Sequence, residues 1–185
     1  MNSTESYIKQ HIALVKQRMQ TFIQLLTRRA LHHDESKLKE PELTWWKQID
    51  KEPKYPYNSS EYNAKMARWS KLFQYHYAHN RHHPEHYPFG VRDMTLVDII
   101  EMLCDWLGYK ENLSISEAFQ ICETQMQRYD IPEDLRHLLF NTLCRYFAAF
   151  GGDPNTIPDG IEEELYKPKN KNSMQLQGNF VDLYV

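Results

Sequence analysis

Residues 7–31 read YIKQHIALVKQRMQTFIQLLTRRAL, and this stretch decides the fold. Apolar side chains recur in it every three or four positions, at Ile8, Ile12, Val15, Met19, Phe22, Leu26 and Ala30. That spacing places them on one face of a helix. We therefore predict one long amphipathic helix from about Tyr7 to Leu31.

The chain that follows favours further helices separated by loops. Pro41 can occupy the first turn of a short helix that runs through Ile49, whereas residues 52–60 carry two prolines and several turn formers and predict a loop. We expect Ser60 to cap the next helix, which reaches about His79. Residues 80–93 contain two prolines and a glycine, so they should be irregular.

The second half of the chain carries explicit helix start signals. Thr95 with Asp98, and Ser114 with Glu117, have the spacing of a capping box, and Pro132 can open a last helix that glycines 151 and 152 close. No alternating strand pattern and no internal repeat is visible. We predict an all-α protein with a single compact helical domain over 1–152 and a polar C-terminal tail over 153–185.

Composition limits the class of protein. The chain has 185 residues, of which 41% are hydrophobic and 25% charged. No apolar run approaches the roughly 20 residues of a membrane helix, and the N-terminus lacks a secretory pattern, so we expect a cytoplasmic protein without a membrane partner. The net charge of -3 makes nucleic acid an unlikely partner, because phosphate binding needs a basic surface.

The three cysteines, Cys104, Cys122 and Cys144, lie far apart in apolar stretches and form no CxxC pair. We expect all three to be reduced core residues.

Histidines are concentrated in one part of the chain. Seven of the nine lie between positions 32 and 86, and the run HDESK at 33–37 places His33 beside Asp34. His76 follows Leu72 by four positions, so it should face inward with the apolar residues of its helix. Imidazoles beside carboxylates are typical ligands of a divalent cation.

Each part of this pattern also has a structural explanation. A single inward histidine is more often a hydrogen-bonded core residue than a ligand. Asp98, Glu101 and Asp105 are spaced three and four positions apart, which is usually a solvated helix face. The ends of neighbouring helices bring several ligand types toward one place, and this convergence favours a metal site.

The ordered set of residues resembles a known family. His33, Asp34 and Lys37 are similar to the His-Asp-x-x-Lys signature of HD-domain metal-dependent phosphohydrolases, in particular the HD-GYP-like branch. The resemblance implies an HD-like helical fold and metal ligands at His33, Asp34, His76, His82, His83 and Asp105. Residues 7 to about 110 also resemble the DUF5662 family of bacterial and phage proteins.

Two departures limit what the HD resemblance implies. HD domains usually have a further ligand upstream, and His11 is the only candidate. If the first helix is unbroken, 22 residues at about 1.5 Å each place His11 roughly 33 Å from His33, so we leave it out of the site. The Gly-Tyr-Pro motif is absent, since the sequence at 86–90 is HYPFG. Specificity for cyclic di-GMP is therefore not carried over.

The expected chemistry is phosphate ester hydrolysis. Two ions bridged by Asp34 would activate a water and neutralise phosphate oxygens, and Mn²⁺, Fe²⁺, Co²⁺ or Zn²⁺ suits the mixed ligands better than Mg²⁺. Asp34, Lys37 and Glu101 are the expected catalytic residues, with Glu101 orienting a ligand or accepting a proton. Lys37, Arg81 and His86 are candidate substrate contacts, with His79 and Glu85 as further candidates.

Aromatic residues are 13% of the chain, and some could stack on a nucleobase. We therefore expect a phosphohydrolase acting on a nucleotide or cyclic nucleotide. The alternative is a non-catalytic helical binding protein with a structural metal or no metal. The two differ in that a catalytic metal site keeps an open position, whereas a structural one is closed by protein ligands.

Overall fold

The computed structural model describes residues 3–111 and 113–143. This part of the chain contains seven α-helices, three short 3₁₀ helices and no strand, which confirms the predicted all-α class. The elements are α1 (Ser3–His32), η1 (Glu35–Leu38), α2 (Glu42–Ile49), α3 (Ser60–Arg68), α4 (Ser70–His79), η2 (Pro84–His86), η3 (Gly90–Asp93), α5 (Leu96–Leu107), α6 (Ile115–Arg128) and α7 (Glu133–Thr142).

The chain divides into two compact units. Of the described residues, the first unit contains 3–109 and 124–131, and the second contains 110–111, 113–123 and 132–143. The predicted boundary at residue 152 and the predicted tail over 153–185 lie outside the described residues. None of the described helices combines the length and the hydropathy that crossing a membrane requires.

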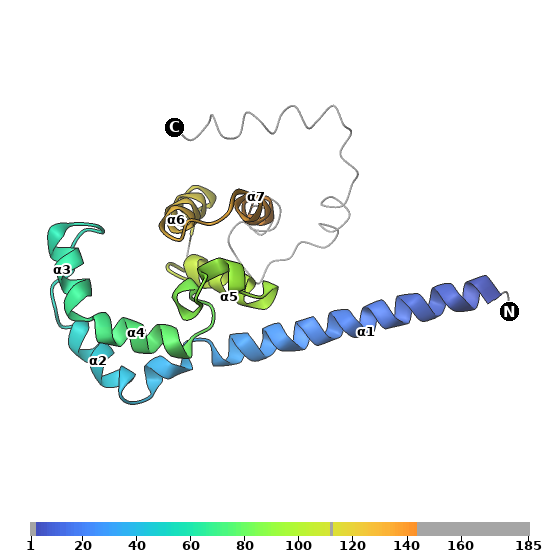
Figure 1. Ribbon diagram of the computed structural model, residues 1–185, viewed down its shortest axis with the longest axis horizontal. Coiled ribbons are helices and arrows are strands. Elements are labelled where there is room, and N and C mark those ends of the chain that lie inside the picture. Colours follow the sequence, from blue (N-terminus) through green and yellow to red (C-terminus); the bar gives the residue numbers. More distant parts are fainter. Residues whose placement is uncertain (1–2, 112, 144–185) are drawn as a thin grey trace, which may run out of the picture. The chain divides into compact units, whose positions relative to one another are not determined.

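Helix α1 is one unbroken helix, as predicted (Figure 1). It ends beside Asp34, whose φ of 54° and ψ of 19° put the backbone in the left-handed region and cannot continue a right-handed helix. The chain turns there into η1. Since α1 is continuous, it separates the exposed His11 from His33, which was the premise for leaving His11 out of the site.

The helix predicted to end near His79 is interrupted, so this prediction was wrong in one respect. Helix α3 ends before Trp69, and α4 begins directly after it. The Trp69 backbone leaves helical geometry at φ −95° and ψ 14°, while its indole Nε1 donates to Glu52 in the preceding loop, at 2.7 Å. The N-cap of α3 is Ser59, whose hydroxyl accepts from the Tyr62 amide, so the prediction of Ser60 as the cap was wrong. The Ser60 hydroxyl donates to Glu61.

The two predicted capping boxes are confirmed. At α5 the Thr95 hydroxyl accepts from the Asp98 amide, and the Asp98 carboxylate accepts from the Thr95 amide at 2.9 Å. Ser114 and Glu117 make the same reciprocal pair before α6. Pro132 precedes α7 as predicted, while the end predicted at glycines 151 and 152 lies outside the described residues.

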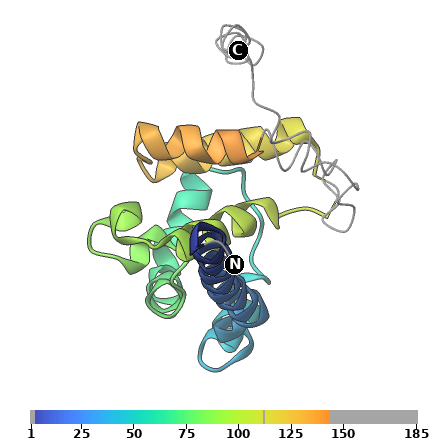
Figure 2. The same ribbon diagram turned by 90° about the vertical axis from the view of Figure 1, so that its right-hand side faces the viewer.

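Each unit has its own apolar interior. In the second unit residues 115–123 of α6 lie beside α7, with the Phe119 and Phe140 rings stacked at 5.7 Å (Figure 2). Cys122 is buried as predicted, but Cys104 is exposed, so the prediction of a core position was wrong for Cys104, and Cys144 lies outside the described residues. Buried apolar residues of the first unit are Ile49, Leu72, Val91, Ile99, Met102, Leu103, Trp106, Met126 and Ile131.

Candidate metal centre

All six residues predicted as metal ligands meet in the first unit. They form two overlapping groups whose ligand atoms lie within 4.8 Å of one another in each group. We call them the first group (Asp34, His76, His82 and His83) and the second group (His33, Asp34, His82 and Asp105). Asp34 and His82 belong to both groups.

Four segments of the chain deliver these ligands. The turn that follows α1 supplies both His33 and Asp34, whose left-handed backbone directs its carboxylate to the same place. Helix α4 supplies His76, and the turn that follows supplies the two adjacent histidines. Asn80, at the end of α4, donates to the Ser36 hydroxyl at 2.8 Å and so ties this turn to η1. Asp105 lies on α5.

The two oxygens of Asp34 face different groups. Its Oδ1 lies 3.4 Å from His76 Nε2 and 3.5 Å from His82 Nε2, while Oδ2 lies 3.6 Å from His33 Nε2. His33 Nε2 is also 3.4 Å from Asp105 Oδ1. Ligand bonds of about 2.0–2.2 Å at ordinary coordination angles separate neighbouring ligand atoms by roughly 3.0–3.6 Å. The spacing therefore suits one ion in each group, with Asp34 between them.

Two of these ligand atoms are buried without a hydrogen bond. Asp34 Oδ1 and His82 Nε2 both lack a hydrogen-bond partner within the described part of the chain, although they lie 3.5 Å apart. A buried polar atom in this state costs free energy unless something satisfies it. An electron-pair acceptor between the two atoms would satisfy both, so the donor set fits a metal cation.

In three of the ligand histidines, the ring nitrogen that does not face Asp34, Nδ1, lies against a carboxylate. Glu42 Oε1 lies 2.6 Å from Nδ1 of His76, and Glu101 Oε1 lies 3.0 Å from Nδ1 of His33 and 3.3 Å from Nδ1 of His82. A carboxylate on Nδ1 fixes the proton there and leaves the lone pair on Nε2 for a metal. All three histidines thus present Nε2 to Asp34.

A half-buried arginine, Arg29, supports this arrangement through the carboxylates behind the histidines. Arg29 Nε donates to Glu101, and its Nη2 lies 3.1 Å from Asp98, whose side chain is only 2% exposed. Burial alone would raise the pKa of Glu101, but hydrogen bonds from His33, His82 and Arg29 hold it well below its usual range. Glu101 therefore stays ionised and suits the predicted orienting role rather than that of a proton acceptor.

Protonation of the histidines follows their surroundings. Hydrogen bonds to Asp105 and then Glu101 raise the pKa of His33 to about 10 in the metal-free protein, so a proton sits where a cation would bind. Burial lowers the pKa of His76 and of His83, which keeps both rings neutral. Burial would raise the pKa of Asp105, but the hydrogen bond to His33 and the neighbouring histidines lower it overall.

The site is closed on one side and open on the other. The side chains of His76 and His82 are 3% and 1% exposed, whereas those of His33 and Asp105 are 32% and 30% exposed. Solvent therefore reaches the second group.

The predicted substrate contacts lie in different surroundings. Lys37 Nζ donates to Asp34 Oδ2 and lies 5.1 Å above the Trp46 ring, so it belongs to the site. Arg81 is engaged with Asp98, with both contacts at 3.3 Å, and is a member of neither ligand group. His86 Nδ1 lies 2.8 Å from the Tyr77 carbonyl oxygen and is likewise outside both groups. Their roles toward a substrate stay predictions.

The two further candidates also lie apart from the ligand groups. His79 is exposed and contacts the Tyr75 carbonyl oxygen through Nδ1, at 2.8 Å. Glu85 forms an ion pair with Arg128 at 3.2 Å. Neither contact brings its side chain into the metal centre.

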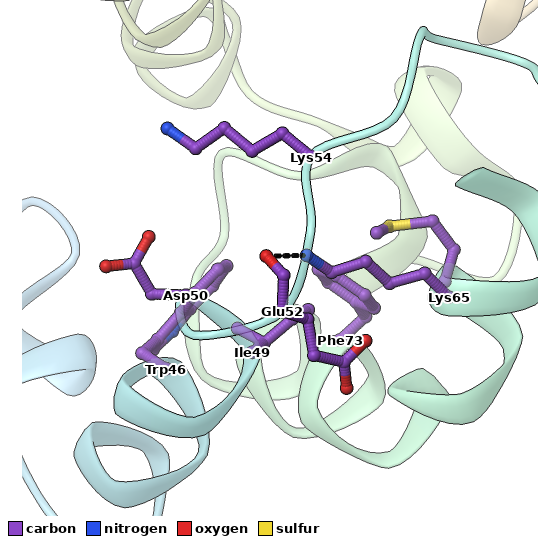
Figure 3. Close-up of a pocket in the computed structure, with 8 residues that line it drawn as sticks. Trp46, Ile49, Asp50, Glu52, Lys54, Lys65 and Phe73 are labelled. Carbon is purple, nitrogen blue, oxygen red and sulfur yellow. Dashed lines mark hydrogen bonds between the residues drawn. The ribbon is translucent and has the colours of Figure 1, made fainter. Parts of the chain in front are cut away.

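A cavity of about 190 Å³ is lined by residues of α2, of the loop after it, of α3 and of α4 (Figure 3). The Trp46 ring lines this cavity and also meets the His76 ring edge-on, with centroids 6.1 Å apart. The buried Lys65 ammonium donates to the carbonyl oxygens of Glu52 and Pro53 at the cavity wall. The full lining is Trp46, Ile49, Asp50, Glu52, Lys54, Lys65, Met66 and Phe73.

Sequence reasoning missed two residues of the centre. Arg29 precedes His33 by four positions and lies in the last turn of α1, directly before the turn that holds His33, and this spacing could have identified it. Glu42 lies 34 positions before His76 and reaches it only through the packing of α2 against α4. No local pattern points to that contact.

Comparison with known proteins gives one match. The model of a family described as "Family of unknown function (DUF5662)" matches residues 1–145. No curated protein and no solved structure matches the chain. The match extends beyond the 7–110 expected from the sequence, and it does not test the resemblance to HD-domain phosphohydrolases.

Proposed function

Because the chain belongs to the DUF5662 family, whose function is unknown, its activity has to be argued from the site, and we propose that it is a metal-dependent phosphohydrolase. One observation carries the proposal: two ligand groups share Asp34 and His82, and the two oxygens of Asp34 face different groups. Bound divalent cations would supply an activated water and neutralise phosphate oxygens. The mixed nitrogen and oxygen ligands favour Mn²⁺, Fe²⁺, Co²⁺ or Zn²⁺ over Mg²⁺.

The protein's own residues have distinct tasks under this proposal. Glu42 and Glu101 keep the histidine rings in the tautomer that directs Nε2 inward. Lys37 is held beside the centre by Asp34 and provides a cation for a non-bridging phosphate oxygen. The resemblance to the HD signature, in which a lysine follows the His-Asp pair by three positions, supports the same role for Lys37.

Solvent access favours catalysis over a purely structural ion. A structural site is closed by protein ligands, but the second group has two ligands that are about a third exposed. Phosphate oxygens and water can approach from that side. The alternative, a helical binding protein with a structural metal or no metal, does not account for the opening.

The substrate class proposed is a nucleotide or cyclic nucleotide. Trp46, whose ring meets that of His76, also lines a cavity in which Phe73, Ile49 and Met66 accompany four charged residues. Aromatic rings in such a place can stack on a base. The Lys65 ammonium uses two of its three N–H donors on the carbonyl oxygens of Glu52 and Pro53, and the third would be left for a carbonyl group of a base. A base bound there would leave its phosphate near Lys37, which lies over the same indole ring.

A hydrolysis screen tests the proposal. The full chain is loaded with Mn²⁺ or Zn²⁺ and offered nucleoside phosphates, cyclic nucleotides and p-nitrophenyl phosphate. We expect chelator-sensitive hydrolysis that His33→Ala and Asp34→Ala abolish while the helical circular dichroism remains. Equal rates on p-nitrophenyl phosphate and nucleotides would remove the case for base recognition. Loss of the fold in both variants, or unchanged behaviour, would favour the non-catalytic alternative.

A further inference from the structure

The apolar face of α1 is exposed along most of its length. Among the described residues, Ile8, Ile12, Val15, Met19 and Phe22 show 50%, 46%, 39%, 58% and 55% of their surface, and we call these five residues the α1 stripe. Figure 1 shows this part of the helix extending past the other helices of the first unit. A continuous apolar row of this length marks an interaction surface.

The surface that matches the α1 stripe is another α1. Outside α1, the exposed apolar side chains of the described residues are scattered over separate elements, and α7 contributes only Leu138 to them. None of these elements offers a row comparable in length with the stripe. We propose that two copies of this chain pair through their α1 helices, arranged antiparallel.

The spacing of the apolar residues fits this pairing. Six apolar residues of α1 are arranged symmetrically about position 17. Nine residues before and after it lie Ile8 and Leu26, five residues before and after it lie Ile12 and Phe22, and two residues before and after it lie Val15 and Met19. An antiparallel partner with its centre at position 17 therefore places Ile8 against Leu26, Ile12 against Phe22, and Val15 against Met19. Each of these six residues meets an apolar residue in this arrangement, as a two-fold interface requires.

Charge selects the antiparallel direction. Helix α1 carries five Lys or Arg residues and one Glu, and Arg28 and Arg29 lie together near its C-terminal end. A parallel pair would bring these basic ends together, and its helix dipoles would align unfavourably. The antiparallel pair separates the basic ends and opposes the dipoles.

The interface is large enough to form a reversible dimer. About half of each stripe side chain is exposed, so pairing removes on the order of 500 Å² of apolar surface per copy. Flanking polar residues bring this toward the roughly 800 Å² per partner of a standard interface. The shared positive excess of the two helices opposes association, and salt should therefore strengthen the dimer.

Sedimentation velocity of the full chain over a concentration series tests the pairing. We expect a monomer–dimer equilibrium that shifts toward dimer as salt rises. Val15→Glu with Met19→Glu should weaken the dimer at least tenfold, whereas Gln10→Glu with Gln17→Glu, which adds the same charge on the opposite helix face, should not. A monomer at all concentrations, including one whose stripe is covered by its own chain, overturns the proposal, as does a dimer that survives the Val15 and Met19 changes.

Cysteine cross-linking tests the direction. A mixture of Val15→Cys and Met19→Cys chains should form a disulfide more readily than either variant alone, against the same background of native cysteines. Cross-linking of each variant with itself, at the expense of the mixture, would indicate a parallel pair and contradict the antiparallel arrangement.

Discussion

The Nδ1 atom of His76 lies 2.6 Å from Oε1 of Glu42, a side chain with no exposed surface. The Trp46 indole donates to the same oxygen at 2.9 Å. Burying a carboxyl group in this way costs free energy, so the position of Glu42 behind the candidate ligand His76 needs a reason. Holding His76 in the tautomer that offers Nε2 to a metal provides one.

Glu42→Gln should therefore weaken metal binding. The amide cannot fix the proton on His76 Nδ1 as a carboxylate does, and loss of such a partner typically costs 10–100-fold in affinity, so we expect about tenfold or more. Calorimetric titration with Zn²⁺ or Mn²⁺ measures the effect. Glu40→Gln changes an exposed carboxylate two positions earlier and serves as the control. Equal affinities for the two variants would remove Glu42 from the centre.

Lys37→Met should separate binding from activity. Lys37 occupies Asp34 Oδ2 in the metal-free protein, so removing it should leave metal affinity unchanged or raise it. Hydrolysis should fall by about tenfold or more, because a charged donor to the phosphate is lost. Lys39→Met, at an exposed lysine that pairs with Glu35, is the matched control. If metal affinity falls and hydrolysis stays normal, the proposed role of Lys37 is wrong.

The metal-free protein should lose stability as the pH rises. The pKa of His33 is raised from 6.5 to about 10 in the folded chain, so protonated His33 stabilises the fold fully below about pH 6.5. This contribution disappears as the pH approaches 10. Urea unfolding with chelator present should show a free energy of unfolding that falls across this window, and less so in His33→Asn. Identical slopes in both proteins would contradict the assignment.

Arg29 should matter more for stability than its neighbour. It compensates the buried carboxylates Asp98 and Glu101, and removing one partner of a buried ion pair leaves uncompensated charge. Because the Arg29 side chain is 25% exposed, we expect Arg29→Met to cost roughly 2–4 kcal/mol of unfolding free energy. Arg28→Met, at an exposed position, should cost under about 0.5 kcal/mol. Similar thermal unfolding of both variants would refute the role of Arg29.

Local rules explain how much of this molecule could be predicted from its sequence. The length of α1 follows from one apolar period, and the start of α5 follows from the capping box of Thr95 and Asp98, because both depend on residues within a few positions. The interruption at Trp69 was missed since it depends on Glu52, which lies 17 positions away. Propensity carries no information about such a contact.

The candidate metal centre, too, could be predicted from the sequence only in part. The order of His33, Asp34, His76, the adjacent pair of histidines and Asp105 identified the ligand groups before any geometry was known. The inward position of His76 was predicted from its spacing to Leu72 and is confirmed, since His76 is buried. The hydrogen-bond partners of the ligands could not be predicted from that order. The engagement of Arg81 with Asp98 and the support of His76 by Glu42 arise from tertiary packing alone.

Counting bound ions in the purified protein tests the central claim most directly. Elemental analysis after loading with Zn²⁺ or Mn²⁺ and gel filtration should find two ions per chain. His83→Ala, which affects only the first group, and Asp105→Ala, which affects only the second, should each leave one ion, while Asp34→Ala should leave none. A folded wild-type chain that retains no ion under these conditions, or a count that none of these substitutions changes, would contradict the account.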